Sequence, residues 1–182
     1  MTTFPDPCLK PVADGMFDAV IEKGLNLVTF AGGALDSPHG YEKTRNSLFA
    51  IASADAMDGV IFLSSALAAH ITPEDFRAFV DRFEGMPRVS IGMEIEGIPS
   101  IRIDTGKGMQ DIVKHLILEH GAERIAFISG PKKNQEANLR LERYREALEM
   151  HGIPFSPELV VPGDSDQSAG PTAIGILMDE RK

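Results

Sequence analysis

Arg140 is the residue of this sequence whose side chain is best suited to hold a small polar molecule. It lies one helical turn before Tyr144, beside the apolar stripe of a predicted helix. A guanidinium offers five donors in a rigid fork, which matches a carboxylate or a pair of sugar hydroxyls. Arg140 also follows Glu136 by four residues, the spacing of an exposed ion pair on a helix. On spacing alone the ion pair is the better interpretation.

The other candidates for ligand binding follow predicted strands. In an open α/β sheet, loops and helix N-termini converge at the carboxyl ends of the strands, and ligands bind there. This rule selects a set of glycine, aromatic and polar residues: Gly33, Tyr41, Ser64, Asp104, Asn134 and Asp164.

Each of these candidates also has a structural interpretation. Gly33 can belong to a flexible turn, since no Gly-Lys-Ser/Thr follows it as a phosphate-binding loop requires. Tyr41 can pack its helix, and Asp104 can cap a helix N-terminus. Ser64 and Asn134 can be ordinary loop residues. The choice between binding and structure is therefore open for every residue of the set.

The sequence contains no arrangement typical of an enzyme or a metal site. His115 and His120 are five residues apart, off the i, i+4 spacing that puts two metal ligands on one helix face, so we expect capping or packing roles. Cys8 lies too close to the N-terminus to be a supported nucleophile, and no Gly-x-Ser-x-Gly motif occurs. The run from Asp164 to Asp166 reads as a solvated loop. We expect no catalytic residue, metal or cofactor; a small α/β enzyme without a recognisable motif stays as an alternative.

Short apolar strands alternate with amphipathic helices along the chain. The predicted strands cover residues 25–30, 59–63, 88–91, 100–103 and 124–129. Such alternation implies right-handed crossovers and parallel sheets flanked by helices, which is an α/β fold. A single flavodoxin-like or receiver-like domain is the rival fold.

Composition limits the partners and the compartment. The chain has 182 residues, 43% of them hydrophobic, and a formal net charge of −9, which argues against a nucleic-acid-binding surface. No apolar run is long enough to span a membrane, and the N-terminus does not resemble a signal peptide. The single cysteine excludes an intrachain disulfide. We expect a cytoplasmic protein that binds neither nucleic acid nor membrane directly through this segment.

An ordered series of motifs points to a family. The series comprises Asp104 after a strand, Gly121, the apolar run 124–128, Gly130-Pro131, Arg140 before Tyr144, and the run 159–164. It resembles the LacI/GalR-type sensor domain, which has a two-lobe, type I periplasmic-binding-protein-like fold. The run from Gly32 to Tyr41 is similar to the LacI-like sensors found at the N-terminus of bacterial diguanylate cyclases and histidine kinases.

The resemblance implies a function for the chain. Arg140 stands at the family position of the ligand-contacting arginine, although Arg143 replaces the small residue usual three positions later. The implied function is a sensor domain that binds a small-molecule effector, sugar-like or nucleoside-like, in an interlobe cleft. A homodimer and a covalently attached output domain are the implied partners. The alternative is the effector-binding domain of a LacI/GalR-family transcriptional regulator whose DNA-binding segment is absent.

The resemblance also implies a division of the chain. Residues 1–103 correspond to an N-terminal α/β lobe, and residues 104–182 correspond to the beginning of a C-terminal α/β lobe. Residues 1–7 contain two prolines and do not supply the strand with which the family begins. We therefore expect a domain truncated at both ends.

Overall fold

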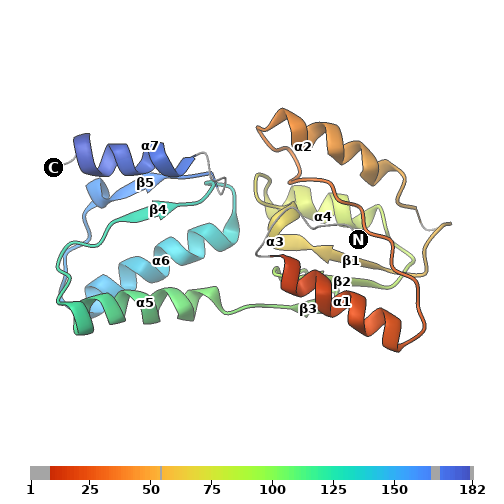
Figure 1. Cartoon of the computed structure of the whole chain (residues 1–182), viewed down its shortest axis with the longest axis horizontal. Helices are drawn as coiled ribbons and strands as arrows, with labels where there is room; N and C mark the ends of the chain where they lie inside the picture. Colours follow the sequence, from red (N-terminus) through yellow and green to blue (C-terminus); the bar gives the residue numbers. More distant parts are fainter. Residues whose placement is uncertain (1–8, 54, 165–168, 181–182) are drawn as a thin grey trace.

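The computed structural model describes residues 9–53, 55–164 and 169–180, so Cys8 and the expected loop at 165–166 lie outside the described residues. Figure 1 shows two α/β units side by side, joined by the segment that follows strand β3. We call the unit from α1 to β3 the N-lobe and the unit from α5 onward the C-lobe. No helix of the described part is both long and apolar enough to cross a membrane.

The N-lobe is built on a parallel three-stranded sheet. Its elements are α1 (Lys10–Glu22), α2 (Gly40–Arg45), the 3-10 helix η1 (Asn46–Ala50), β1 (Val60–Leu63), α3 (Ser64–Leu67), α4 (Pro73–Asp81), β2 (Arg88–Ile91) and β3 (Ser100–Ile101). The strand order is β1-β2-β3, with Val60 opposite Arg88 and Ser90 opposite Ser100. The predicted α/β class with parallel strands is confirmed here.

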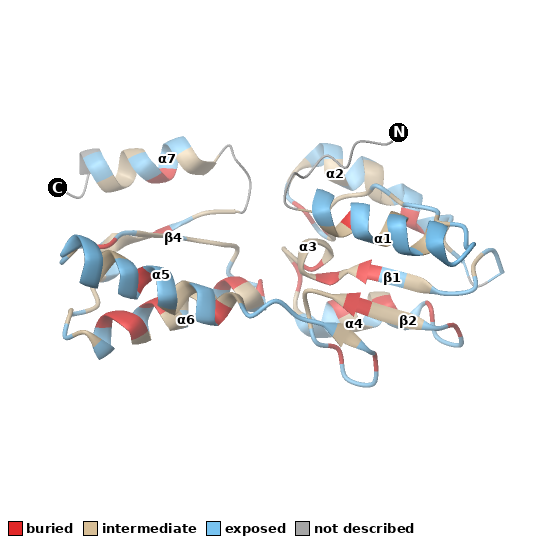
Figure 2. Ribbon diagram, turned by 60° about the horizontal axis from the view of Figure 1, so that its bottom comes forward, coloured by how far each residue is buried: buried red, intermediate tan, exposed pale blue. Residues whose placement is uncertain are grey.

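The core of the N-lobe is aromatic. Phe62 of β1 is 3% exposed and meets Phe76, Phe79 and Phe83 edge to face, with ring centroids 5.4 to 6.5 Å apart. Helix α4 supplies two of these rings, Phe76 and Phe79, because its apolar residues recur at the helical period, and Phe83 lies just after the helix ends. Thr72 fixes the start of α4 by accepting a hydrogen bond from the backbone N–H of Asp75. Figure 2 shows the buried centre of β1 and β2 as red segments.

The predicted strand at residues 25–30 is wrong. The segment has no strand assignment and pairs with none of the described strands. Leu25 is 61% exposed and Val28 is 67% exposed. An apolar run forms a strand only where a neighbour satisfies its backbone N–H and C=O groups, and this run has no such neighbour among the described strands.

The C-lobe repeats the plan with two parallel strands. Its elements are α5 (Thr105–His120), β4 (Phe127–Ser129), α6 (Gln135–Met150), the 3-10 helix η2 (Pro157–Leu159), β5 (Val160–Pro162), α7 (Ala169–Gly175) and the π-helix η3 (Ile176–Glu180). β4 and β5 pair with Phe127 opposite Val160. The predicted strand at 124–129 is therefore shorter than expected, since it begins at Phe127.

Helices α5 and α6 pack together around a buried tyrosine. Tyr144 is fully buried; its hydroxyl donates to the Ile125 carbonyl at 2.7 Å, and its ring stacks on Phe127 at 5.0 Å. Val113 of α5 and Leu148 of α6 belong to the same core. This core fixes the two helices against β4, and so it fixes where their N-termini lie.

Candidate functional site

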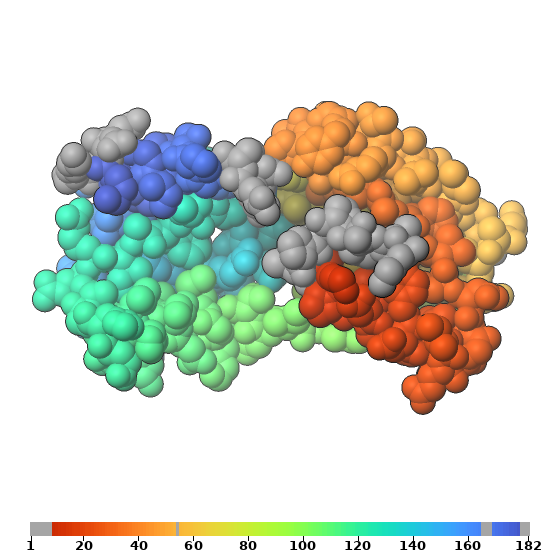
Figure 3. All heavy atoms as spheres, viewed as in Figure 1, coloured from red at the N-terminus to blue at the C-terminus, as the bar shows by residue number. Residues whose placement is uncertain are grey.

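The two lobes turn the same end of their sheets toward each other. The carboxyl ends of β1 and β2 point toward the C-lobe, and those of β4 and β5 point toward the N-lobe (Figures 1 and 2). Helices α5 and α6 begin at this face, as does the connection from β3 to α5. Figure 3 shows the lobes as two adjoining masses, coloured red to yellow and green to blue. We call the facing ends the interlobe face.

The loop before α2 is held in a fixed shape by Asn46. The backbone N–H of Gly33 donates to the Asn46 Oδ1 at 2.7 Å, and the Asn46 Nδ2 donates to the Ala34 carbonyl at 2.8 Å. A Cβ on Gly33 would lie 2.5 Å from the Cβ of Glu42, and one on Gly32 would lie 2.3 Å from the Cζ of Phe49. The two glycines are therefore close-packed against the helical segment that follows.

Tyr41 is on the surface of α2 rather than in a core. Its side chain is 56% exposed, and its ring stacks on His39 with centroids 5.7 Å apart. The Arg45 guanidinium lies over the Tyr41 ring, 5.3 Å from the ring centroid. Two planar rings and a cation thus present an aromatic surface beside the loop of Gly33.

Ser64 is buried at the end of β1. Its side chain is 0% exposed, and its Oγ lies 2.7 Å from the Oγ of Ser90, which also donates to the Met93 carbonyl at 2.5 Å. These bonds tie the end of β1 to the end of β2. A ligand would reach the Ser64 hydroxyl only by displacing this pairing.

Asp104 and Asn134 cap the two helices that begin at the interlobe face. The Asp104 Oδ1 accepts from the Lys107 N–H at 2.9 Å, and the Asn134 Oδ1 accepts from the Ala137 N–H at 2.7 Å. Asn134 is 8% exposed, whereas Asp104 is exposed. The capping interpretation thus describes Asp104, and Asn134 is a helix cap rather than an ordinary loop residue.

Arg140 has no partner in the described part of the chain. It lies in the second turn of α6 and is half-buried, and its guanidinium makes no hydrogen bond or ion pair with a described residue. The ion pair with Glu136 that the spacing favours is therefore not formed. An arginine that is partly desolvated without a compensating acceptor can bind an acceptor brought by a ligand.

Arg143 is accommodated by a glycine on the facing helix. Its Nη1 donates to the Glu146 Oε2 at 2.6 Å, and Gln110 of α5 donates to the same oxygen at 3.0 Å. A Cβ on Gly106 would lie only 3.3 Å from the Arg143 Cγ. The hydrogen bond from Arg143 to Glu146 raises the pKa of the guanidinium above its ordinary value. The large Arg143 side chain thus packs between α5 and α6. Because its guanidinium is bound to Glu146, it is not a free cation.

Asp164 contacts the other lobe. It follows β5, and its Oδ2 lies 4.0 Å from the Nε2 of His39. The Nε2 is buried without a hydrogen-bond partner, while the His39 backbone N–H donates to the buried Ser37 Oγ at 3.1 Å. The His70 ring approaches His39 edge to face at 6.4 Å. His39 and Asp164 therefore bring polar groups from both lobes to one place at the interlobe face.

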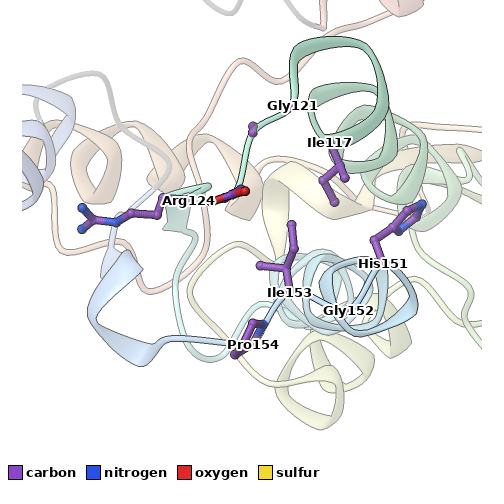
Figure 4. Close-up of a pocket in the computed structure, with 9 residues that line it drawn as sticks. Ile117, Gly121, Arg124, His151, Gly152, Ile153 and Pro154 are labelled. Carbon is purple, nitrogen blue, oxygen red and sulfur yellow. The ribbon is translucent and has the colours of Figure 1, made fainter.

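A surface hollow lies at the opposite end of the C-lobe. It has a volume of about 560 Å³ and is lined by residues at the ends of α5 and α6: Ile117, Gly121, Ala122, Glu123, Arg124, His151, Gly152, Ile153 and Pro154. Figure 4 shows Ile117 and Ile153 pointing into it, with the Arg124 side chain directed away. None of the residues predicted to bind a ligand lines this hollow.

Two residues of the candidate site and its supporting loop could not be found from the sequence. His39 and Asn46 carry no spacing signal, because their roles depend on a partner lobe in one case and a folded loop in the other. The run from Gly32 to Tyr41, unusual in its density of glycine and polar residues, was the available hint.

Several known proteins that are similar to this chain are named as transcriptional regulators. No protein-family model matches the sequence. Catabolite control protein A of Streptococcus mutans is 35% identical over 116 residues, which are 63% of this chain and 32% of that protein. The HTH-type transcriptional repressor CytR of Escherichia coli is 27% identical over 182 residues, 96% of this chain and 49% of the repressor. The chain thus spans about a third to a half of the length of these relatives.

The fold is also shared with solved regulators. The structure of the transcriptional regulator CelR in complex with cellobiose superposes with a TM-score of 0.72 at 29% identity, over 97% of this chain and 51% of that chain. The chain therefore has the mixed α/β fold, with parallel sheets and flanking helices, of LacI-family periplasmic-binding-protein-like domains.

Proposed function

We propose that this chain is an effector-binding domain of a LacI/GalR-type transcriptional regulator. Its sequence relatives are named as regulators of transcription, and none of those described above is named as a diguanylate cyclase or a histidine kinase. The relatives therefore favour the transcriptional alternative over the sensor of a signalling protein. An attached cyclase or kinase output domain has no support from them.

The observation that carries this proposal is the guanidinium of Arg140, which has no partner among the described residues. It is half-buried in α6, whose N-terminus lies at the face where two parallel sheets present their carboxyl ends. Loops and helix N-termini that meet at such a face form the usual ligand site of α/β proteins. Arg140 then supplies directed donors to an acceptor group of the effector.

The other predicted residues divide between contact and support. We assign direct contact to Arg140, Asp164 and Tyr41, whose side chains are at least partly accessible. Gly33 and Asn134 hold the loop and the helix that frame the site. Ser64 and Asp104 are also proposed contacts. A ligand would bind them by replacing the hydrogen bonds that they now make to Ser90 and Lys107.

The expected effector is a sugar or a nucleoside. Both classes carry hydroxyl groups that pair with a guanidinium and a carboxylate, and both have a face that stacks on an aromatic ring. The CelR structure was solved with cellobiose, a sugar. The stacked rings of His39 and Tyr41 offer such a face beside Asp164.

Binding would act by closing the lobes. With residues 1–103 and 104–182 as the two lobes, an effector that touches both favours the conformation in which they approach. Effector binding shifts that two-state equilibrium only by its difference in affinity for the two conformations. In the whole regulator, a homodimer would carry this shift to a DNA-binding segment outside the present sequence.

A ligand screen tests the proposal. Sugars and nucleosides are added singly to the chain, and a rise in melting temperature identifies binders. Small-angle scattering of the chain with the best binder should then show a smaller radius of gyration, as closure requires. A panel in which no compound binds, or one in which binding leaves the radius unchanged, contradicts the proposed function.

A further inference from the structure

Two histidine rings meet at the end of α5. The Nε2 atoms of His115 and His120 lie 3.1 Å apart, with ring centroids 4.9 Å apart and the rings nearly perpendicular. The five-residue spacing, which is off the i, i+4 spacing of two metal ligands on one helix face, therefore still allows the two rings to meet at this helix end. His120 is the last residue of α5, and helical side chains lean toward the N-terminus, so its ring reaches back over the turn that carries His115.

The separation of the two nitrogens suits a single metal ion. Histidine nitrogens bind zinc at about 2.0 to 2.1 Å. Two nitrogens 3.1 Å apart then subtend an angle of about 98° at the ion, between the right angle of an octahedral site and the tetrahedral angle. Both residues are exposed, so small rotations of the rings can direct both lone pairs to one point without disturbing a core.

The electrostatic setting favours a cation. Unpaired carbonyl groups give a helix C-terminus a partial negative charge, and both histidines belong to the C-terminal half of α5, which ends at Gly121 in the left-handed conformation. The chain also carries a formal net charge of −9. A divalent cation at this helix end would therefore be attracted both by the helix C-terminus and by the net negative charge of the chain.

We propose that His115 and His120 form a binding site for a divalent first-row transition metal ion, with zinc as the probe. Neutral imidazole is a preferred ligand of zinc, nickel and copper ions. Within the described residues no group of three or more His, Cys, Asp or Glu side chains is placed to hold a metal. Water therefore completes the coordination. The end of α5 lies on the side of the C-lobe away from the N-lobe, so this site is separate from the proposed effector site (Figure 1).

Calorimetric titration with zinc chloride tests the site. The unaltered chain should bind one zinc ion per chain with saturable heat, and EDTA should reverse the binding. His115→Ala and His120→Ala should each weaken binding at least about tenfold, because loss of a supporting neighbour alone weakens metal sites by about 10 to 100 times. Both residues are exposed, so neither variant should alter the melting temperature in EDTA.

A third histidine of the C-lobe provides the matched control. The Nδ1 of His151 lies 2.7 Å from the Ala147 carbonyl, and His151→Ala should leave zinc affinity unchanged. The proposal is overturned if the unaltered chain shows no saturable binding, or if His115→Ala and His120→Ala bind zinc as tightly as His151→Ala. Neither outcome depends on an effector, so the metal site and the proposed function fail separately.

Discussion

Replacing Gly32 with alanine probes how tightly the loop of the candidate site is packed. The added Cβ would lie 2.3 Å from the Phe49 Cζ, 2.8 Å from the Phe49 Cε1 and 2.8 Å from the Asn46 Oδ1. Ordinary contacts of a Cβ begin near 3.4 Å, so the Phe49 ring must move by roughly 1 Å. That ring is 9% exposed and meets Phe79 edge to face at 5.8 Å, which leaves little room.

The expected cost follows from overpacking. Inserting a methyl group into a closely packed site typically costs about 1 to 3 kcal/mol. Movement of Asn46 would also weaken its bonds to Gly33 and Ala34. For a domain of this size, each kcal/mol corresponds to roughly 2 to 4 °C in melting temperature. Gly32→Ala should therefore lower the melting temperature by several degrees.

Gly40→Ala is the matched control for this substitution. Gly40 begins α2, and a Cβ there would meet no atom within 4 Å. Alanine at such a position stabilises by about 0.4 to 1 kcal/mol, because the unfolded chain loses conformational freedom. Thermal unfolding followed by circular dichroism compares the two variants. Equal melting temperatures for Gly32→Ala and Gly40→Ala would refute the close packing of the loop.

Further predictions concern other parts of the chain. Tyr144→Phe leaves the buried Ile125 carbonyl without its donor and should destabilise by about 1 to 3 kcal/mol. Burial raises the pKa of Tyr144, so the native state favours the neutral phenol; stability should fall as pH rises above about 10, and Tyr144→Phe should remove that loss in denaturation curves. Asn134→Ala should cost about 1 kcal/mol by denaturant titration and Asn134→Asp much less, whereas equal losses would argue against a cap. With a formal net charge of −9, the chain should show no salt-dependent binding to duplex DNA; a micromolar complex in a fluorescence titration would count against this.

Helices were predictable because their signals are local. The Asp104 cap and the left-handed Gly121 directly flank α5, and the structure has both. The apolar period lies within α5 and buries Val113, although Ile112 stays 50% exposed. The same is true of α4, which begins after Thr72 with proline in its first turn. Such elements carry their own start, face and end in consecutive residues.

Strands and contacts between elements were less predictable because they depend on neighbours. Residues 25–30 have the composition of a strand but no adjacent strand among those described. His39 meets Asp164 only because the lobes face each other, and Asn46 meets Gly33 only after the loop has folded. The meeting of His115 and His120 shows that ideal helical spacing does not decide side-chain contacts at a helix end.

The contact between Arg140 and the effector is the central claim, and a pair of arginine variants tests it. Arg124→Ala is the control, since Arg124 is exposed at the hollow on the far end of the C-lobe. Calorimetric titration uses the sugar or nucleoside that raises the melting temperature most. Arg140→Ala should weaken binding by about 1.5 to 3 kcal/mol, roughly tenfold to a hundredfold, with the melting temperature of the free chain nearly unchanged. Equal effector affinity for Arg140→Ala, Arg124→Ala and the unaltered chain would contradict the assignment of Arg140 to the site.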